Sequence, residues 1–474
     1  MDWQIVHIRI NDAATGQPTP VRLRLGSDHR YFPPLGRPDV IPVEWGESVG
    51  GCLQIGNRSY SYIDGSCEAR LPAGQLHVEI SKGPEFAPVH ETVELLPGQL
   101  SLRLGITRRF DLAAEGWYAG DTHAQFLTPH AAALEGAAEG LQAVNLLASA
   151  AYLPDLLHFS GQVPALESHG STVVTNTLND GGDLGRLSLL NCHRIVFPLT
   201  LDAAGFERYT LADWSQQCHR KGGLAVWPRF PAEPGEAIAN LLLGAIDAVE
   251  WTAPDPFAVA GLPEWYRLLN LGFRVPLVGG SGKGSNAIPL GAARTCAYLG
   301  AKREFNYGRW IDAIRSGQTF VTRGPLLRLT VNGLGPGADV ADDSAANQTP
   351  IAAQVEAFAV EPFERVELVR DGEIVADAMP DADNVARISA NVAPGISGWL
   401  AARCWSADGL SAHTSPIYLS GAKPTANPAL AKPLFQQLDW LTSFAEDHAA
   451  DAAQERHLLE IAARARGELE KRLQ

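Results

Sequence analysis

The sequence lacks several patterns that would assign a function directly. Its six cysteines occur without the CxxC or CxH spacing of common zinc sites, which favours reduced, buried thiols. No P-loop pattern occurs. No apolar run approaches the roughly 20 residues of a membrane span, and the first residues lack the basic and apolar segments of a signal peptide. We therefore expect a cytoplasmic protein with no membrane partner.

Positive charge is also scarce. The chain carries 38 Lys and Arg against 53 Asp and Glu, a net charge of −15 at pH 7, and it has no long basic run. Such a surface disfavours nucleic acid as a partner. The 474 residues exceed one ordinary domain, and an apolar content of 46% is sufficient for a large buried core.

The hydrophobic periodicity divides the chain into four regions. Residues 1–110 contain short alternating runs separated by turn residues, which predicts an N-terminal β-sandwich. Residues 111–325 alternate strands with helices, which predicts an α/β barrel or a related layered fold. Residues 326–420 predict a second β-sandwich. Residues 421–474 read as a linker and a helical tail, which we expect to pack on the body or on a second copy in a homo-oligomer.

Within residues 111–325 the pattern also predicts individual elements. The expected helices are 131–147, 211–221, 236–243, 262–271 and 306–316, and the expected strands are 172–177, 184–190, 194–199, 224–227, 248–251 and 275–278. Ligands in such folds gather at the carboxyl ends of the strands.

One segment of this region, Trp117 to Phe126, carries residues suited to metal chemistry. Asp121 and His123 are two positions apart, so a strand would present both on the same side. A divalent cation needs convergent oxygen and nitrogen donors. The pair is therefore a candidate beginning of a metal-ligand set.

Several segments of the chain occur in a fixed order: Gly120-Asp121-Thr122-His123, Leu184-Gly185-Arg186, Gly222-Gly223 with Pro228-Arg229-Phe230-Pro231, Ala248-Val249-Glu250, Gly279-Gly280-Ser281-Gly282-Lys283 and Thr319 to Leu327. Together they resemble the carbaryl-hydrolase-like branch of the PHP (polymerase and histidinol phosphatase) superfamily. The resemblance implies a PHP-type distorted α/β barrel flanked by two β-sandwiches. It also implies descent from metal-dependent hydrolases that use a divalent ion such as Zn, Mn or Fe.

Five positions depart from that family pattern. Gln125, Gly182, Arg186 and Arg229 stand where the family carries histidines, and Gly282 stands where it carries an aspartate. Asp121, His123 and Glu250 remain as metal-ligand candidates. Glycine offers no side-chain donor, and a guanidinium group would repel a cation. These substitutions predict a degenerate metal site.

The two arginines suggest a replacement for the metal. We expect Arg186 and Arg229 to reach the former site and pair with Asp121 and Glu250, because buried carboxylates need partners. The alternative is that both arginines point to solvent.

Three functions are compatible with these residues. The favoured one is a catalytically impaired or non-catalytic relative that binds a small molecule. The second is a hydrolase of an ester, amide or phosphoester with one metal on Asp121, His123 and Glu250, whose bound water would be the nucleophile. The third is an anionic-ligand protein with a pocket of Arg186, Arg229 and Lys283. The candidate ligand contacts are Gln125, Asn179, Arg186, Arg229 and Lys283.

Overall fold

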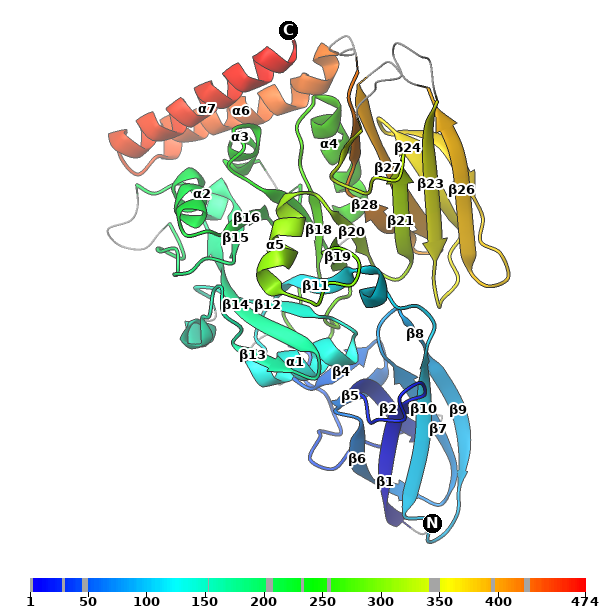
Figure 1. Ribbon diagram of the computed structural model, residues 1–474. Helices are drawn as coiled ribbons and strands as arrows, with labels where there is room; N and C mark the ends of the chain where they lie inside the picture. Colours follow the sequence, from blue (N-terminus) through cyan, green and yellow to red (C-terminus); the bar gives the residue numbers. More distant parts are fainter. Residues whose placement is uncertain are drawn as a thin grey trace.

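A long, curled sheet lies at the centre of the computed structural model, with the N-terminal sheets at one end and the C-terminal strands and a helical pair at the other (Figure 1). The structure describes residues 3–27, 30–44, 50–151, 153–201, 208–231, 234–253, 257–340, 350–393, 397–421 and 427–474. It shows a mixed α/β protein.

The N-terminal strands form two sheets around one core. One sheet has the order β6-β1-β10-β8, and the other has the order β4-β5-β2-β7-β9 with β3 beside β2. Alternate residues of β1 (Val6, Ile8 and Ile10) face this core, as a half-buried strand requires. The strands are β1 (Trp3–Asp12), β2 (Val21–Ser27), β3 (Arg30–Tyr31), β4 (Cys52–Ile55), β5 (Arg58–Ile63), β6 (Ser66–Pro72), β7 (Gly74–Ser81), β8 (Phe86–Ala87), β9 (Val89–Leu95) and β10 (Ser101–Arg108).

The central sheet begins in the α/β region with the order β18-β17-β16-β15-β14-β12-β11-β19-β20. Its strands are β11 (Trp117–Ala124), β12 (Ala143–Ala148), β13 (Leu166–Ser168), β14 (Ser171–Asp180), β15 (Arg186–Leu190), β16 (Leu224–Trp227), β17 (Ala248–Thr252), β18 (Leu277–Gly280), β19 (Arg294–Tyr298) and β20 (Thr319–Thr322). The sheet curls until β18 packs against β11, and a backbone bridge joins Ala124 to Lys283. The carboxyl ends of β11, β17 and β18 therefore meet.

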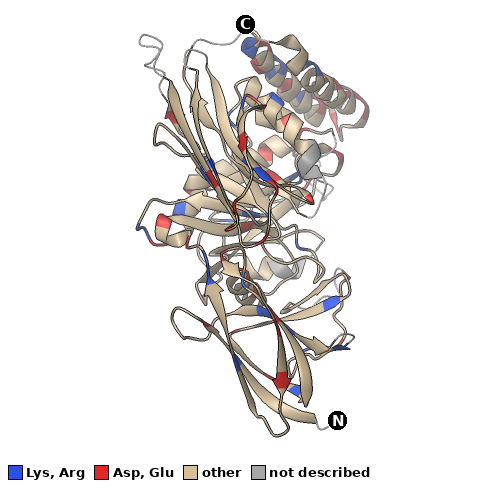
Figure 2. Cartoon of the chain, turned by 90° about the vertical axis from the view of Figure 1, so that its right-hand side faces the viewer, with Lys and Arg blue, Asp and Glu red and all other residues tan. Residues whose placement is uncertain are grey.

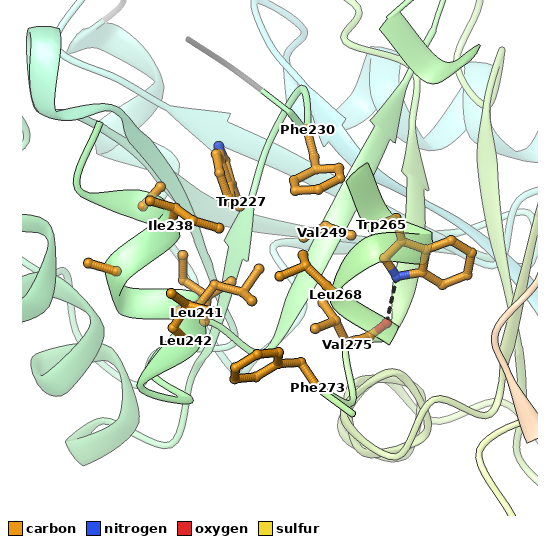
Figure 3. Packing of buried hydrophobic residues seen from close by; sticks show 14 of the residues in the cluster. Trp227, Phe230, Ile238, Leu241, Leu242, Val249, Trp265, Leu268, Phe273 and Val275 are labelled. Carbon is orange, nitrogen blue, oxygen red and sulfur yellow. Dashed lines mark hydrogen bonds between the residues drawn. The ribbon is translucent and has the colours of Figure 1, made fainter. Parts of the chain in front are cut away.

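Five helices accompany this sheet: α1 (Pro129–Ala138), α2 (Leu211–Arg220), α3 (Ala237–Leu242), α4 (Phe257–Asn270) and α5 (Tyr307–Arg315). Three of these helices begin directly after residues whose side chains commonly cap helix N-termini. Thr128 caps α1, Thr210 and Asp213 form a capping box on α2, and Asn306 caps α5. Aromatic and aliphatic side chains of α3, α4 and the neighbouring strands pack together beside the sheet (Figure 3).

Two expectations about individual elements are wrong. The helix expected over 131–147 ends at Ala138, and residues 143–148 form the buried strand β12 instead. Gly140, with φ of 73°, follows the helix end. A short, fully buried apolar run cannot be told from a buried helix by periodicity. Residues 194–199 form no strand.

The C-terminal strands do not form a sandwich of their own. Strand β20 pairs with β19 on one side and with β28 on the other, so the central sheet continues through β28, β27, β24 and β25. A separate sheet, β21-β23-β26, packs beside this extension. The strands are β21 (Leu326–Val331), β22 (Asp339–Val340), β23 (Ile351–Phe358), β24 (Arg365–Arg370), β25 (Glu373–Ala378), β26 (Val385–Val392), β27 (Gly398–Ser406), β28 (Gly409–Thr414) and β29 (Ile417–Leu419). The predicted second sandwich thus shares one of its sheets with the α/β region.

The tail forms two antiparallel helices, α6 (Pro428–His448) and α7 (Ala452–Arg472). Leu434, Leu438 and Leu441 are buried and join the core around α3 and α4, which confirms that the tail packs on the body. The outer faces of α6 and α7 mix acidic and basic residues (Figure 2). A homo-oligomer formed through the tail stays a prediction. None of the described helices is both long and apolar enough to span a membrane.

Candidate functional site

The candidate site lies at the carboxyl end of β11, where the curled sheet closes on itself. Every residue from Tyr118 to Ala124 is buried. The pairing of β11 with β12 becomes irregular between Asp121 and Ala124. Asn145 of β12 holds this end of the strand, since its amide donates to the Asp121 carbonyl at 2.9 Å. The irregular strand end turns successive side chains toward β17 and β18.

The Asp121 carboxylate is fully buried and is held by backbone amides. Its Oδ1 accepts hydrogen bonds from the N–H groups of His123 and Ser281, each at 2.9 Å, and its Oδ2 accepts one from Gly291 at 2.8 Å. Burial raises the pKa of Asp121, and these hydrogen bonds oppose the rise. Asp121 thus ties the end of β11 to the loop after β18 and to the turn before β19.

His123 and Glu250 form a second buried unit. The Nδ1 atom of His123 lies 2.9 Å from Oε1 of Glu250. Thr252 donates to the same oxygen at 2.6 Å, and Thr122 donates to Oε2 at 2.8 Å. Burial acts to raise the pKa of Glu250, but His123 and the two hydroxyls outweigh it and hold the pKa below its usual value. The ionised Glu250 therefore orients His123 with a proton on Nδ1.

Two glycines allow this close packing. A Cβ atom on Gly280 would lie 2.7 Å from Cβ of His123 and 2.9 Å from Oε2 of Glu250. Gly282 has φ of 61°, and a Cβ there would lie 2.6 Å from Cγ2 of Thr252. An aspartate at position 282, as the PHP pattern would have it, would therefore be strained here. The loop is shaped for glycine.

The donor set does not fit a catalytic metal ion. His123 contacts Asp121 through its backbone N–H and Glu250 through its ring, but both carboxylates already accept further hydrogen bonds from the chain. Zinc normally takes at least three protein donors, each with a free lone pair directed at it. Within the described ranges, no three His, Cys, Asp or Glu side chains are placed to hold a metal.

The expected pairing of Arg186 and Arg229 with Asp121 and Glu250 is wrong. Arg186 is exposed, and its Nε lies 2.9 Å from Oδ2 of Asp180 in a neighbouring strand. Arg229 is also exposed, and its backbone N–H donates to Thr252. Hydroxyl, amide and imidazole donors satisfy the two carboxylates at short range. The arginines are therefore free to point outward.

The predicted cationic pocket of Arg186, Arg229 and Lys283 is not formed. Lys283 is fully buried, lies 3.2 Å from Oε2 of Glu135 and donates to the Ile288 carbonyl at 2.7 Å. Asn179, another predicted contact, donates to the Val196 and Pro198 carbonyls. Gln125 is half-buried, and its backbone N–H donates to the Lys283 carbonyl. These residues engage different partners within the fold.

Several residues of the site escaped the sequence reasoning. Thr252 lies two positions after Glu250, so strand alternation could have placed both on one side of β17. Thr122 lies within the opening motif. No local sequence pattern marks Gly291 or Glu135. Gly291 bonds to Asp121 across 170 residues of sequence, and Glu135 approaches Lys283 only because α1 packs there.

Comparisons with known proteins assign no family. No family model matches the sequence, and no curated protein matches it significantly. The chain is similar to the crystal structure of PsfC from Pseudomonas syringae PB-5123, with 18% identity over 43% of this chain and 90% of that one, at a TM-score of 0.32. A glycosyl hydrolase family 2 member from Bacteroides cellulosilyticus DSM 14838 shows 10% identity over 86% of this chain and 59% of its own, at a TM-score of 0.18. A calcium-binding mutant of Bacteroides uniformis beta-glucuronidase 2 shows 8% identity over 90% and 59%, at 0.21. Similarities this low support no conclusion about fold or function. The conclusions below are drawn from the geometry of the chain itself.

Proposed function

We propose that this chain is a PHP-like α/β protein whose central site braces the fold instead of hydrolysing a substrate, and that the protein binds a small molecule. In this proposal the curled sheet descends from a PHP-type barrel. The residues kept from the ancestral metal site now close the sheet by joining β11, β17 and the loop after β18.

The coordination of Asp121 carries the proposal. A metal-ligating carboxylate directs lone pairs at the ion, whereas both oxygens of Asp121 receive backbone N–H groups from three separate segments. Binding a cation there would leave buried amides without acceptors, at about 1–3 kcal/mol for each group. The substituted positions Gly182, Arg186, Arg229 and Gly282 supply no compensating donor.

The competing function is a hydrolase with one metal ion. It is favoured by the contact between His123 and Glu250, two of its three expected ligands. Elemental analysis separates the two. The full chain would be produced in medium supplemented with zinc and manganese and purified without chelator. We expect far less than one ion per chain, and the same content in His123→Ala and in the control His130→Ala, whose side chain is exposed on α1. About one ion per chain, lost in His123→Ala but retained in His130→Ala, would overturn the proposal.

Activity gives an independent readout. We expect the wild-type chain and His123→Ala to hydrolyse p-nitrophenyl acetate and p-nitrophenyl phosphate at the same background rate. His123→Ala should nevertheless be less stable, by about 1–3 kcal/mol, because it removes a partner of the buried Glu250. A wild-type rate well above that of the variant would support the hydrolase instead.

A further inference from the structure

A crevice of about 490 Å³ lies where the N-terminal sheets, the central sheet and the C-terminal strands meet. Strand β8 marks this junction (Figure 1). The charged side chains on the wall are three arginines and three carboxylates, and the apolar ones include Phe86, Pro289 and Pro325; the charged residues are Arg22, Arg294, Arg323, Glu139, Glu361 and Asp408. The walls thus come from three parts of the chain and combine guanidinium groups with flat apolar surfaces.

Arg294 is the unusual member of this wall. It is only 6% exposed, and its two hydrogen bonds go to neutral carbonyls: Nε donates to Gly291 at 3.0 Å and Nη1 donates to Glu139 at 2.8 Å. Within the part of the chain that the structure describes, it forms no ion pair with a carboxylate. Burial lowers its pKa, which expresses the cost of holding this charge away from water. A buried guanidinium is normally paired with an anion.

The carboxylate of Glu139, which lines the same crevice, is engaged by other residues. Oε1 of Glu139 accepts from Nη1 of Arg22 at 2.7 Å and from the hydroxyl of Tyr62 at 2.8 Å. The carbonyl that Arg294 contacts lies at the C-terminal end of α1, where the helix dipole supplies about half a negative charge. That partial negative charge offsets only part of the positive charge of the Arg294 guanidinium.

The two other arginines also line the crevice, each near a carboxylate. The Nε atom of Arg22 is buried and has no hydrogen-bond partner. Arg323 stands at the rim, 3.1 Å from the largely exposed carboxylate of Asp408, and such an exposed pair contributes little. An incoming anion could replace water around these groups without breaking a buried ion pair.

We propose that this crevice is the ligand site and that it binds a small organic anion, namely a carboxylate or phosphate group attached to an aromatic or similarly flat apolar body. Arg294 contacts the anionic group from the floor, with Arg22 and Arg323 beside it. Phe86, Pro289 and Pro325 cover the apolar body. This inference rests on the proposed small-molecule function and names its ligand class.

The crevice is connected to the buried group of Asp121, His123 and Glu250 through one residue, Gly291. Gly291 donates its N–H to Asp121 and accepts from Arg294 through its carbonyl. The Asp121 brace therefore fixes the turn that positions the Arg294 guanidinium. The residues of the former metal site would support ligand binding from behind without touching the ligand.

Calorimetric titration with phenyl phosphate, inorganic phosphate and phenol tests this ligand class. We expect phenyl phosphate to bind, inorganic phosphate to bind at least about ten-fold more weakly, and phenol to show no binding, because only the first supplies both the charge and the apolar body. Binding of phenol as tight as that of phenyl phosphate would overturn the charge assignment. No binding of any of the three would overturn the site.

A blocking substitution tests the location. A Cβ on Gly324, which lines the crevice, meets nothing within 4 Å, so Gly324→Trp should fold and fill the space. Gly335 has equally open surroundings and does not line the crevice, so Gly335→Trp is the matched control. We expect Gly324→Trp to abolish phenyl phosphate binding and Gly335→Trp to leave it unchanged. Equal affinity in both variants would refute the location.

Charge variants complete the test. Arg294→Met should weaken phenyl phosphate at least about ten-fold and Arg323→Ala a few-fold, since the buried group is less screened. Arg186→Ala, an exposed arginine elsewhere, should have no effect. If Arg294→Met does not fold, Gly324→Trp still tests the location of the site and Arg323→Ala still tests the role of charge. A metal-binding result would overturn the proposed bracing role alone, whereas a binding failure would overturn this inference alone.

Discussion

Two regions of this molecule bury charge in opposite ways. Around Asp121, His123 and Glu250 every carboxylate oxygen accepts hydrogen bonds from the chain itself. Around Arg294 a guanidinium is buried against neutral carbonyls beside an open crevice. In the first region the chain's own donors use most of the acceptor capacity of the two carboxylates, whereas in the second the buried charge has no carboxylate partner among the described residues. Hydrogen-bond saturation, more than the presence of suggestive residue types, distinguishes a structural centre from a candidate binding site.

The largest effect is expected from His413, a buried residue that is saturated in its neutral form. It borders a cavity of about 20 Å³ that Glu250 also lines, its Nε2 lies 2.6 Å from the Tyr266 hydroxyl, and its Nδ1 lies 2.7 Å from the Thr414 carbonyl. Burial lowers the pKa of His413 to about 3. The unfolded chain therefore binds a proton below pH 6.5 that the folded chain does not bind until about pH 3.

Stability should consequently fall as the pH drops from about 6.5 to 3, by up to about 5 kcal/mol from this residue. Urea unfolding of wild type and His413→Gln at pH 7 and pH 4 measures the difference. We expect the variant to lose clearly less stability between the two pH values. Parallel losses in the two proteins would show that His413 is not held neutral.

The next effect concerns the buried pair of Lys283 and Glu135. Lys283→Met should destabilise the chain by about 3–5 kcal/mol, because it leaves Glu135 buried without its cation. The double variant Lys283→Met with Glu135→Gln should recover much of this loss, since the amide still accepts from the Gly51 N–H. Chemical denaturation of the single and double variants measures the coupling. Strictly additive losses would show that the two side chains do not stabilise each other.

A smaller effect is expected from Gly280→Ala at the bracing centre. The added Cβ would press on His123, Thr122 and Glu250, which should cost about 1–3 kcal/mol. Gly324→Ala is the control, because its Cβ meets no atom within 4 Å. Thermal unfolding of the two variants should show a clear drop for position 280 and almost none for position 324. Equal melting temperatures would mean that the centre is looser than the distances indicate.

The smallest effect on stability is expected from Arg294→Met. Removal of a buried charge that lacks a carboxylate partner relieves desolvation, while two carbonyls lose a donor, so the net change should stay below about 1.5 kcal/mol. Urea unfolding beside Lys283→Met gives the comparison. A loss as large as that of Lys283→Met would show that Arg294 serves the fold, and would remove the contrast between the two regions.

Much of the element structure could be predicted from local patterns. Strands β16 and β17 and helices α2 and α5 follow their apolar periodicity and caps to within a residue or two. Strand β12 was missed because its fully buried run has no alternation, and the break after α1 depends on Gly140. The pairing of β20 with β28 could not be predicted, since two strands some 90 residues apart leave no local pattern in the sequence.

For the site, the sequence by itself determined which residue types are present: Asp121, His123 and Glu250 remain, and glutamine, glycine or arginine occupies the other positions expected to ligate a metal. Strand alternation also placed Asp121 and His123 at one strand end. Only the tertiary structure decided what these residues do. Distant backbone amides saturate Asp121, Arg186 and Arg229 turn outward, and Arg294 is buried beside a crevice, because hydrogen-bond partners and solvent access are set by segments far apart in the chain.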